Sequence, residues 1–181
     1  CQVTNCTSSA TITGRTAGGR RESIGGIVGE NRGTVSNNFA FDVTIGNIDS
    51  YYGAIVGENT YLAILSNNYY FNCTVSGRTS NIGCNGADVT TDNGAYNLSP
   101  AHFEQTGTNE YTIHSAVGWE VFCDMLANSD KGYFTGKTVK LGNDIQISRA
   151  AGLDQHDFTG TFDGQGNTIK LAFGTSQNRY T

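Results

Sequence analysis

The sequence predicts an all-β protein, a parallel β-helix (β-solenoid) with rungs of about 30 residues and one short capping helix near residues 118–128. Three observations predict this fold. One phrase of sequence occurs twice, at Gly25–Asn31 and at Gly53–Asn59. Apolar residues recur with a period of two, which is typical of strands that have one buried face. The chain contains 24 glycines but only one proline, and this suits tight turns between strands that use every backbone N–H.

The repeated phrases set the period of the coil. Gly25–Asn31 matches Gly53–Asn59 at an offset of 28 (25 to 53), and Ser36–Asn38 matches Ser66–Asn68 at an offset of 30 (36 to 66). Two residues are therefore inserted in the second copy, within Thr60–Leu65. A period that tolerates small insertions indicates a solenoid.

A partial copy opens the chain. Val3–Cys6 corresponds to Val35–Asn38 at an offset of 32 (3 to 35). Further along this copy, Ala10 and Ile12 lie one residue out of phase with the later copies. A bulge or a shorter turn in this first rung would restore the alignment.

Stacking of the copies predicts columns of equivalent side chains, about 4.8 Å apart. We expect an alternating set to face the interior: Phe39, Phe41, Val43, Ile45, Tyr69, Phe71, Cys73 and Val75. Asn5, Asn37 and Asn67 are expected to form one inward column whose amides bond along the stack. Gly29 and Gly57 are expected to form another column, where the backbone bends too sharply for a side chain.

A second coil is predicted in the C-terminal half. Gly136–Leu141 matches Gly166–Leu171 at an offset of 30 (136 to 166). Its interior is expected to hold Val139, Leu141, Ile145 and Ile147. Ahead of it, one helical face is apolar at i, i+3, i+4 and i+7, at Trp119, Phe122, Cys123 and Leu126. We expect this helix to cover the exposed strand edges of the first rung of the second coil.

The domain organisation follows from where the repeat fades. We interpret Ile82–Gly86 as a worn third copy of the Ile-Val-Gly phrase. Polar and turn-forming residues, with Pro100 among them, then predict an irregular linker at 95–115. The predicted domains are solenoid rungs at 1–94 and, at 116–181, the capping helix with the first rungs of a second β-helix segment.

The glycine- and asparagine-rich phrases resemble the GLUG-motif repeats of bacterial cell-surface proteins. Gly136–Ile145 and Phe158–Ile169 resemble the start of a parallel β-helix in the same group of proteins. The resemblance covers roughly residues 1–77 and 111–173. It implies a secreted, extracellular or cell-surface bacterial protein with an adhesin-like role, because the group includes adhesin-like and IgA-protease-like surface proteins. It assigns no catalytic residue to this chain.

Charge and hydropathy disfavour two classes of partner. The net charge is −5, from 11 basic and 16 acidic residues, whereas nucleic acid requires a clustered basic face. Arg15, Arg20 and Arg21 form the one basic cluster, and we interpret it as a solvated loop. No stretch approaches the ~18 apolar residues of a membrane span.

The two ends of the sequence suggest a piece of a longer protein. The chain opens on Cys1 rather than Met, within a repeat, and no capping pattern follows Phe173. A bare last rung would expose unpaired backbone groups. Three outcomes would relieve this: further rungs in the parent protein, which we favour, the first coil folding back over the second, or end-to-end self-association of two chains.

The cysteines predict packing more than chemistry. There are five, at positions Cys1, Cys6, Cys73, Cys84 and Cys123, so they cannot all pair within one chain. None has C-x-x-C spacing, which disfavours a zinc or redox site. We interpret most of them as small buried side chains, with a Cys73–Cys84 disulfide as the alternative.

One acidic cluster could be catalytic. Asp154, Asp157 and Asp163 lie close in sequence with His156 among them, and β-helix lyases and hydrolases use acidic pairs. The favoured interpretation is that Asp163–Asn167 forms a turn and the other carboxylates cap loops. No ligand spacing appears among the histidines, His102, His114 and His156, so we expect no metal and no cofactor.

Four tyrosines are the candidate ligand-binding residues. Tyr51, Tyr52 and Tyr61 are predicted in loops, and Tyr70 is predicted to point outward from its strand. Exposed tyrosines suit a glycan or a host protein, because each presents a flat apolar face with a polar tip. The alternative is that they shield the solenoid wall. The predicted function is a structural or adhesive module that binds host, matrix or glycan ligands, and the alternative is a carbohydrate-active enzyme on the same scaffold.

Overall fold

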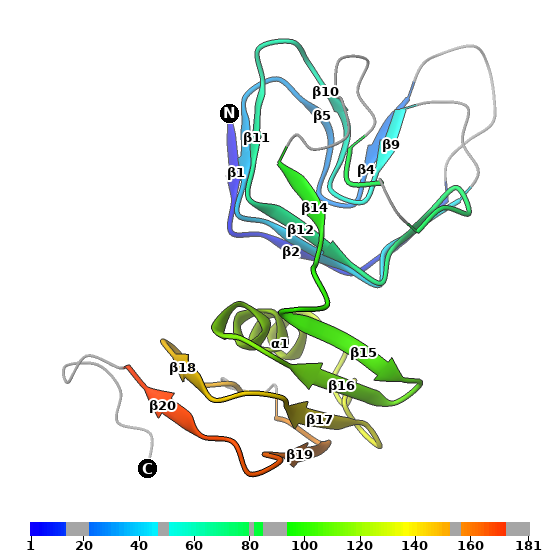
Figure 1. The fold of residues 1–181 in the computed structure, drawn as a ribbon. Coiled ribbons are helices and arrows are strands. Elements are labelled where there is room, and N and C mark those ends of the chain that lie inside the picture. The colour runs from blue at the N-terminus through cyan, green and yellow to red at the C-terminus, as the bar shows by residue number, and fades with distance from the viewer. Residues whose placement is uncertain (14–21, 47–50, 80–81, 85–93, 153–156, 173–181) are drawn as a thin grey trace. The chain divides into compact units, whose positions relative to one another are not determined.

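The computed structural model confirms the predicted β-solenoid (Figure 1). It describes residues 1–13, 22–46, 51–79, 82–84, 94–152 and 157–172. The chain divides into two compact units, Cys1–Leu98 and Ser99–Thr181. Segment 95–115, expected to be an irregular linker, instead contains three strands. These strands are β14 (Ala95–Asn97) in the first unit, and β15 (Phe103–Gly107) and β16 (Glu110–Ile113) in the second.

The first unit is built of short strands that stack in parallel, rung upon rung. Its described residues form five sheets along the stack. One contains β1 (Gln2–Thr4), β6 (Thr34–Ser36) and β11 (Ile64–Ser66). The next contains β2 (Thr7–Ser8), β7 (Phe39–Phe41), β12 (Asn68–Phe71) and β14. The third contains β3 (Thr11–Ile12), β8 (Thr44–Ile45) and β13 (Thr74–Val75). The last two pair β4 (Ser23–Gly25) with β9 (Tyr51–Gly53) and β5 (Val28–Asn31) with β10 (Val56–Asn59).

The strand register confirms the offsets predicted for the first unit. Val28 lies beside Val56, and Val35 lies beside both Val3 and Leu65. The worn third copy is also present, because Val56 bridges to Cys84. The first rung is one residue shorter: its offset is 32 where Thr7 meets Phe39 but 33 where Thr11 meets Thr44. A shorter turn therefore restores the phase, as expected.

The asparagine ladder lies one residue later than predicted. Asn37 and Asn67 are exposed and have φ of 56° and 52°, so they form the left-handed turn. The inward column is instead Asn38 and Asn68, which are buried. Asn38 Nδ2 donates to Asn68 Oδ1 at 2.8 Å, and Asn38 Oδ1 accepts from the backbone N–H of Cys6 at 2.9 Å. Asparagine is one of the few residues that adopt φ > 0 readily, so the first Asn turns the chain and the second bonds inside.

The predicted alternation of buried side chains is wrong at one point in each rung. Val43 and Cys73 face the core as expected. On strands β7 and β12, however, the residues that face the core are Ala40 and Tyr70, and not the aromatic residues next to them in the sequence. The left-handed residues Asp42 and Asn72, each with φ of 52°, interrupt the strands and shift the parity. Phe39 and Phe41 are buried too, and their rings stack with centroids 5.7 Å apart.

The predicted glycine column is confirmed by the close approach of backbones. A Cβ built on Gly57 would lie 2.6 Å from the carbonyl oxygen of Gly29. A Cβ on Gly29 would lie 2.6 Å from the carbonyl oxygen of Ser23. A side chain at Gly57 would therefore force the stacked rungs apart, and one at Gly29 would open the bend between β4 and β5 of its own rung.

The second unit has the same kind of stack with a different beginning. β15 pairs with β16 as an antiparallel hairpin, and β17 (Thr138–Leu141) and β19 (Thr161–Asp163) follow in parallel. A second sheet pairs β18 (Ile145–Ile147) with β20 (Ile169–Leu171). Val139, Leu141, Ile145 and Ile147 are all buried, as predicted.

The repeat predicted within the second unit is wrong. Thr168–Leu171 does not lie beside Thr138–Leu141: Val139 pairs with Phe162, and Ile145 pairs with Ile169. The rung offset is therefore 23 at the first pair (139 to 162) and 24 at the second (145 to 169), and not 30. The two phrases look alike because each begins with a left-handed glycine, Gly136 and Gly166, that leads into a strand.

The predicted helix is α1 (Ala116–Asn128), which begins two residues earlier than expected. Ser115 caps it, and its hydroxyl accepts from the N–H of Gly118 at 3.2 Å. The buried face includes the four predicted apolar residues. The helix packs on β15, β16 and β18, where β18 has a strand partner on one side only among the described residues. It thus covers the edge of β18, which confirms the expected capping role.

Candidate functional site

The structure separates the four candidate tyrosines. Tyr70 is 2% exposed and lies in the core of the first unit, so the prediction that it points outward is wrong. Tyr51 and Tyr52 are half-buried on β9, and Tyr52 packs against the core. Tyr61 is 85% exposed. Of the four, only Tyr61 therefore presents most of its ring to solvent.

Tyr61 lies at an exposed apolar corner between β10 and β11. Leu62 is 86% exposed and Ile64 is 57% exposed, so three large apolar side chains gather within a short segment. We refer to Thr60–Ile64 as the Tyr61 corner. It coincides with the two-residue insertion in the repeat, because the preceding rung turns between Asn31 and Thr34 without it. Sequence reasoning missed Leu62 and Ile64, although an apolar insertion in a polar turn was a usable signal.

A second asparagine ladder fixes this corner to the stack. Asn31 is 3% exposed, and its Nδ2 donates to Asn59 Oδ1 at 2.7 Å and to the carbonyl of Ile64 at 3.0 Å. Thr60 donates through its N–H and its hydroxyl to the carbonyl of Asn31, each at 3.0 Å. Ala63 N–H donates to the carbonyl of Thr60 at 2.9 Å, which closes a tight turn. The apolar tip is therefore held at both ends by the rung beneath it.

Charged groups lie on the rungs beside the corner. Glu30 and Glu58 are neighbours in adjacent rungs, so two carboxylates stack one rung apart. Arg32 Nε lies 2.6 Å from Glu30 Oε1, and the Ser23 hydroxyl donates to Glu58 Oε2 at 2.7 Å. These partners offset the repulsion between like charges that face each other across strands. The arrangement gives an apolar tip with a polar, mixed-charge base.

The candidate catalytic carboxylates do not form an acid–base pair in the described part of the chain. Asp154 and His156 lie outside the described residues. Asp163 accepts from the N–H of Gln165 at 3.0 Å and from its side-chain amide, so it closes the predicted turn. Asp157 is exposed at the border of a shallow hollow that Leu126 and Tyr133 also line. Among the described residues, no three of the His, Cys, Asp and Glu side chains group closely enough to hold a metal ion.

Two histidines meet partners at the start of α1. His102 Nδ1 lies 2.9 Å from the Ser115 hydroxyl, and His114 Nε2 lies 2.8 Å from Glu104 Oε1. A Ser–His contact can activate a nucleophile. Here Ser115 has extended backbone geometry and its oxygen already accepts from Gly118, so it serves as a helix cap. The contacts hold the hairpin and the helix start together.

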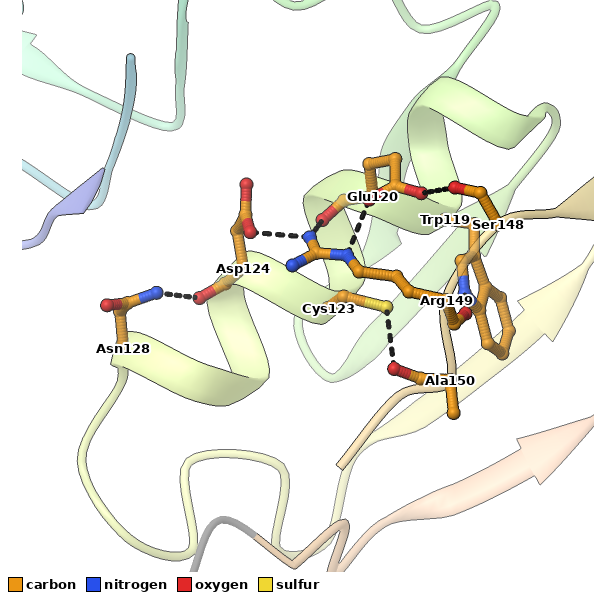
Figure 2. Close-up of polar contacts among 8 residues, drawn as sticks. All are labelled: Trp119, Glu120, Cys123, Asp124, Asn128, Ser148, Arg149 and Ala150. Carbon is orange, nitrogen blue, oxygen red and sulfur yellow. Dashed lines mark hydrogen bonds and ion pairs between the residues drawn. The ribbon is translucent and has the colours of Figure 1, made fainter. Parts of the chain in front are cut away.

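A polar clasp joins α1 to the residues that follow β18 (Figure 2). Arg149 Nη2 lies 2.5 Å from Asp124 Oδ1 and donates to the carbonyl of Glu120 at 2.8 Å. Arg149 Nε makes no aligned hydrogen bond but lies 2.5 Å from Glu120 Oε2. Burial opposes the charge of Arg149, but the hydrogen bond and charge of Asp124 outweigh it and raise the pKa of the guanidinium. Trp119 Nε1 also donates to the Arg149 carbonyl, at 2.9 Å. The clasp is structural, because it fixes the helix to the first rung.

No disulfide joins any of the five cysteines, so the alternative of a Cys73–Cys84 disulfide is wrong. Only Cys73 and Cys123 are buried, whereas Cys84 is half-buried and Cys1 and Cys6 are exposed, so the interpretation of most cysteines as buried side chains is wrong. Burial raises the pKa of the Cys73 thiol to about 11 and that of the Cys123 thiol to about 12. These two thiols are therefore poor nucleophiles at neutral pH.

Comparison of the chain with models of protein families, with curated proteins and with solved structures found no match in any of the three. Within the described ranges, the one helix is too short to cross a lipid bilayer. The Tyr61 corner thus stands as the candidate site on its geometry alone.

Proposed function

We propose that the chain is a structural, adhesive module of an extracellular or cell-surface bacterial protein, and that the Tyr61 corner contacts a glycan or a host protein. The observation that carries the proposal is the insertion in an otherwise regular stack. The two rungs match residue by residue on either side of this point, but the second rung has two more residues in the turn. This longer turn contains Tyr61 and Leu62, which are 85% and 86% exposed. Apolar side chains left in water contribute little to folding, so a binding role accounts for them better.

The surroundings of the corner support the proposal. Binding loops on rigid scaffolds lose little conformational entropy on association. The asparagine ladder holds both ends of the Tyr61 corner, so the tip is preorganised. A tyrosine beside a leucine presents a flat apolar surface with one hydroxyl, which suits the apolar face of a sugar or a protein side chain. The resemblance to GLUG-motif repeats of bacterial surface proteins favours the extracellular setting.

The test is binding of the full 181-residue chain to arrays of glycans and of host matrix proteins. The double variant Tyr61→Ala/Leu62→Ala removes the apolar tip and should abolish any binding seen. Val117→Ala is the matched control, because Val117 is also an exposed apolar residue, at 42%, but lies on α1. Exposed substitutions of this kind change stability by only about 0.5 kcal/mol, so folding should be retained. A bound ligand whose affinity is the same for both variants would contradict the proposal.

A further inference from the structure

The second unit is closed at one of its two ends. β15 is an antiparallel strand with a bulge between Gln105 and Gly107, and bulged edges resist further pairing. The neighbouring edge of β18 is covered by α1, which the Arg149 clasp holds in place. New strands therefore have little opportunity to add at this end.

The opposite end of the second unit is open. β19 and β20 are the last strands of their sheets, and no strand among the described residues pairs with their outer edges. Interior side chains are exposed there as well. Phe162 continues the column of Tyr111 and Val139 but is 38% exposed, where Val139 is 0% exposed. Leu171 pairs with Ile147, yet Leu171 is 66% exposed and Ile147 is 4% exposed. The end thus presents core residues together with strand edges.

We propose that this open end binds the same end of a second copy of the chain through a twofold axis, with β19 of each copy antiparallel to β20 of the other. Strand parity and charge select the register. Phe162 faces the interior, so it must lie opposite Ile169 or Leu171, the two residues of β20 that also face the interior. We choose Leu171, the more exposed of the two, because this register also pairs opposite charges. Antiparallel pairing then places Asp163 of each copy opposite Lys170 of the other. Both of these residues lie on the outer face, in line with Lys140 and Gln146 of the preceding rung.

Charge complementarity favours this pairing over the alternatives. The twofold axis creates the Asp163–Lys170 contact twice, and cross-strand pairs of opposite charge stabilise a sheet. Pairing β20 with itself about its centre would instead place two copies of Lys170 face to face. Asp163 already accepts from Gln165, but a carboxylate has about four lone-pair sites, so it can accept from Lys170 also. Within its own unit, Asp163 lies beside Lys140 on the neighbouring strand. Lys140 forms an ion pair with Glu110, with 2.8 Å between Lys140 Nζ and Glu110 Oε2.

The test is sedimentation equilibrium of the full chain from about 1 µM to about 500 µM, since short strands predict a dissociation constant on the order of tens of micromolar. Leu171→Lys places a charge on the exposed interior column and should weaken the dimer about tenfold or more. Val117→Lys is the control, because Val117 is an exposed apolar residue on α1 and lies neither on β19 or β20 nor in the Tyr61 corner. A chain that stays monomeric throughout, or that dimerises equally well with Leu171→Lys and with Val117→Lys, would overturn the proposal.

A charge exchange tests the register itself. Lys170→Glu should weaken the homodimer, because each copy then sets Glu against Asp163. Asp163→Lys should weaken it too, because each copy then sets Lys against Lys170. An equimolar mixture of the two variants restores opposite charges in both contacts, so it should dimerise at least about tenfold more tightly than either variant alone. No gain on mixing, with both variants folded by circular dichroism, would rule out this register. The proposal uses none of the residues of the Tyr61 corner, so either can fail without the other.

Discussion

The buried asparagine ladder allows the sharpest test of the fold, through one pair of neighbouring residues. Asn67→Gly and Asn68→Gly introduce the same backbone freedom one residue apart. Asn67 is exposed with φ of 52°, a conformation that glycine adopts without cost, so we expect a change within about 0.5 kcal/mol. Asn68 is 0% exposed and its side chain lies at the centre of the ladder. The two substitutions should therefore differ strongly in their effect on stability.

The magnitude for Asn68→Gly follows from the groups that lose partners. Asn68 Oδ1 accepts from the backbone N–H of Asn38 at 3.1 Å and from its Nδ2 at 2.8 Å. Asn68 Nδ2 donates to the carbonyls of Val35 at 3.0 Å and Gly94 at 2.8 Å. The Gly94 carbonyl keeps the N–H of residue 68, and the Val35 carbonyl lies in the parallel ladder with β11, so the main loss is at the N–H and the Nδ2 of Asn38. Unpaired buried groups cost about 1–3 kcal/mol each and are not additive, which gives about 2–4 kcal/mol for the variant.

Hydrogen exchange measured by mass spectrometry is the appropriate assay, because the chain has two units and a single unfolding transition is not guaranteed. Peptides from 25–75 should exchange roughly 30-fold to 1000-fold faster in Asn68→Gly, at about 1.4 kcal/mol per factor of ten. Trp119, the one tryptophan, lies in the second unit, so its fluorescence should not change. Equal effects of the two substitutions, or a loss below about 0.5 kcal/mol for Asn68→Gly, would refute the inward assignment of the ladder.

Three further results are expected. Arg149→Lys should destabilise the second unit by about 1 kcal/mol, because one ammonium cannot reach both Glu120 and Asp124, and Trp119 fluorescence in urea measures this change. A thiol reagent at pH 8 should label Cys1 and Cys6 quickly and spare Cys73 and Cys123, whose pKa values of about 11 and about 12 keep them protonated; equal labelling of all the cysteines before denaturation would contradict their burial. A panel of plant and host polysaccharides should show no sugar release by the chain, and release that Asp157→Ala or Asp163→Ala abolishes would favour the carbohydrate-active alternative.

Much of the candidate site could be read from the sequence, and part could not. The insertion at Thr60–Leu65 and the exposed Tyr61 were visible as a break in the repeat. The outward placement of Tyr70 rested on unbroken alternation from Tyr69 to Val75. Asn72 adopts φ of 52° in the middle of this stretch, which changes which face the earlier residues present. A single left-handed residue is enough to shift the parity of a whole strand. The presence of an asparagine in the sequence does not by itself predict that conformation.

The sequence by itself determined the architecture of the first unit. Stacked rungs require the same residue types at equivalent positions, and these recur in the sequence as a repeat. It also determined the helix, whose apolar face follows the helical period. Only the tertiary structure decided which phrases lie side by side in the second unit. Gly136 and Gly166 both introduce strands, but one rung contains more than one such turn, so similarity of phrases does not fix the partner. Exposure was likewise decided by the stack: Ile147 and Leu171 are alike in sequence terms, but among the described residues a further strand, β20, lies beside Ile147 and none lies over Leu171, so one is core and the other surface.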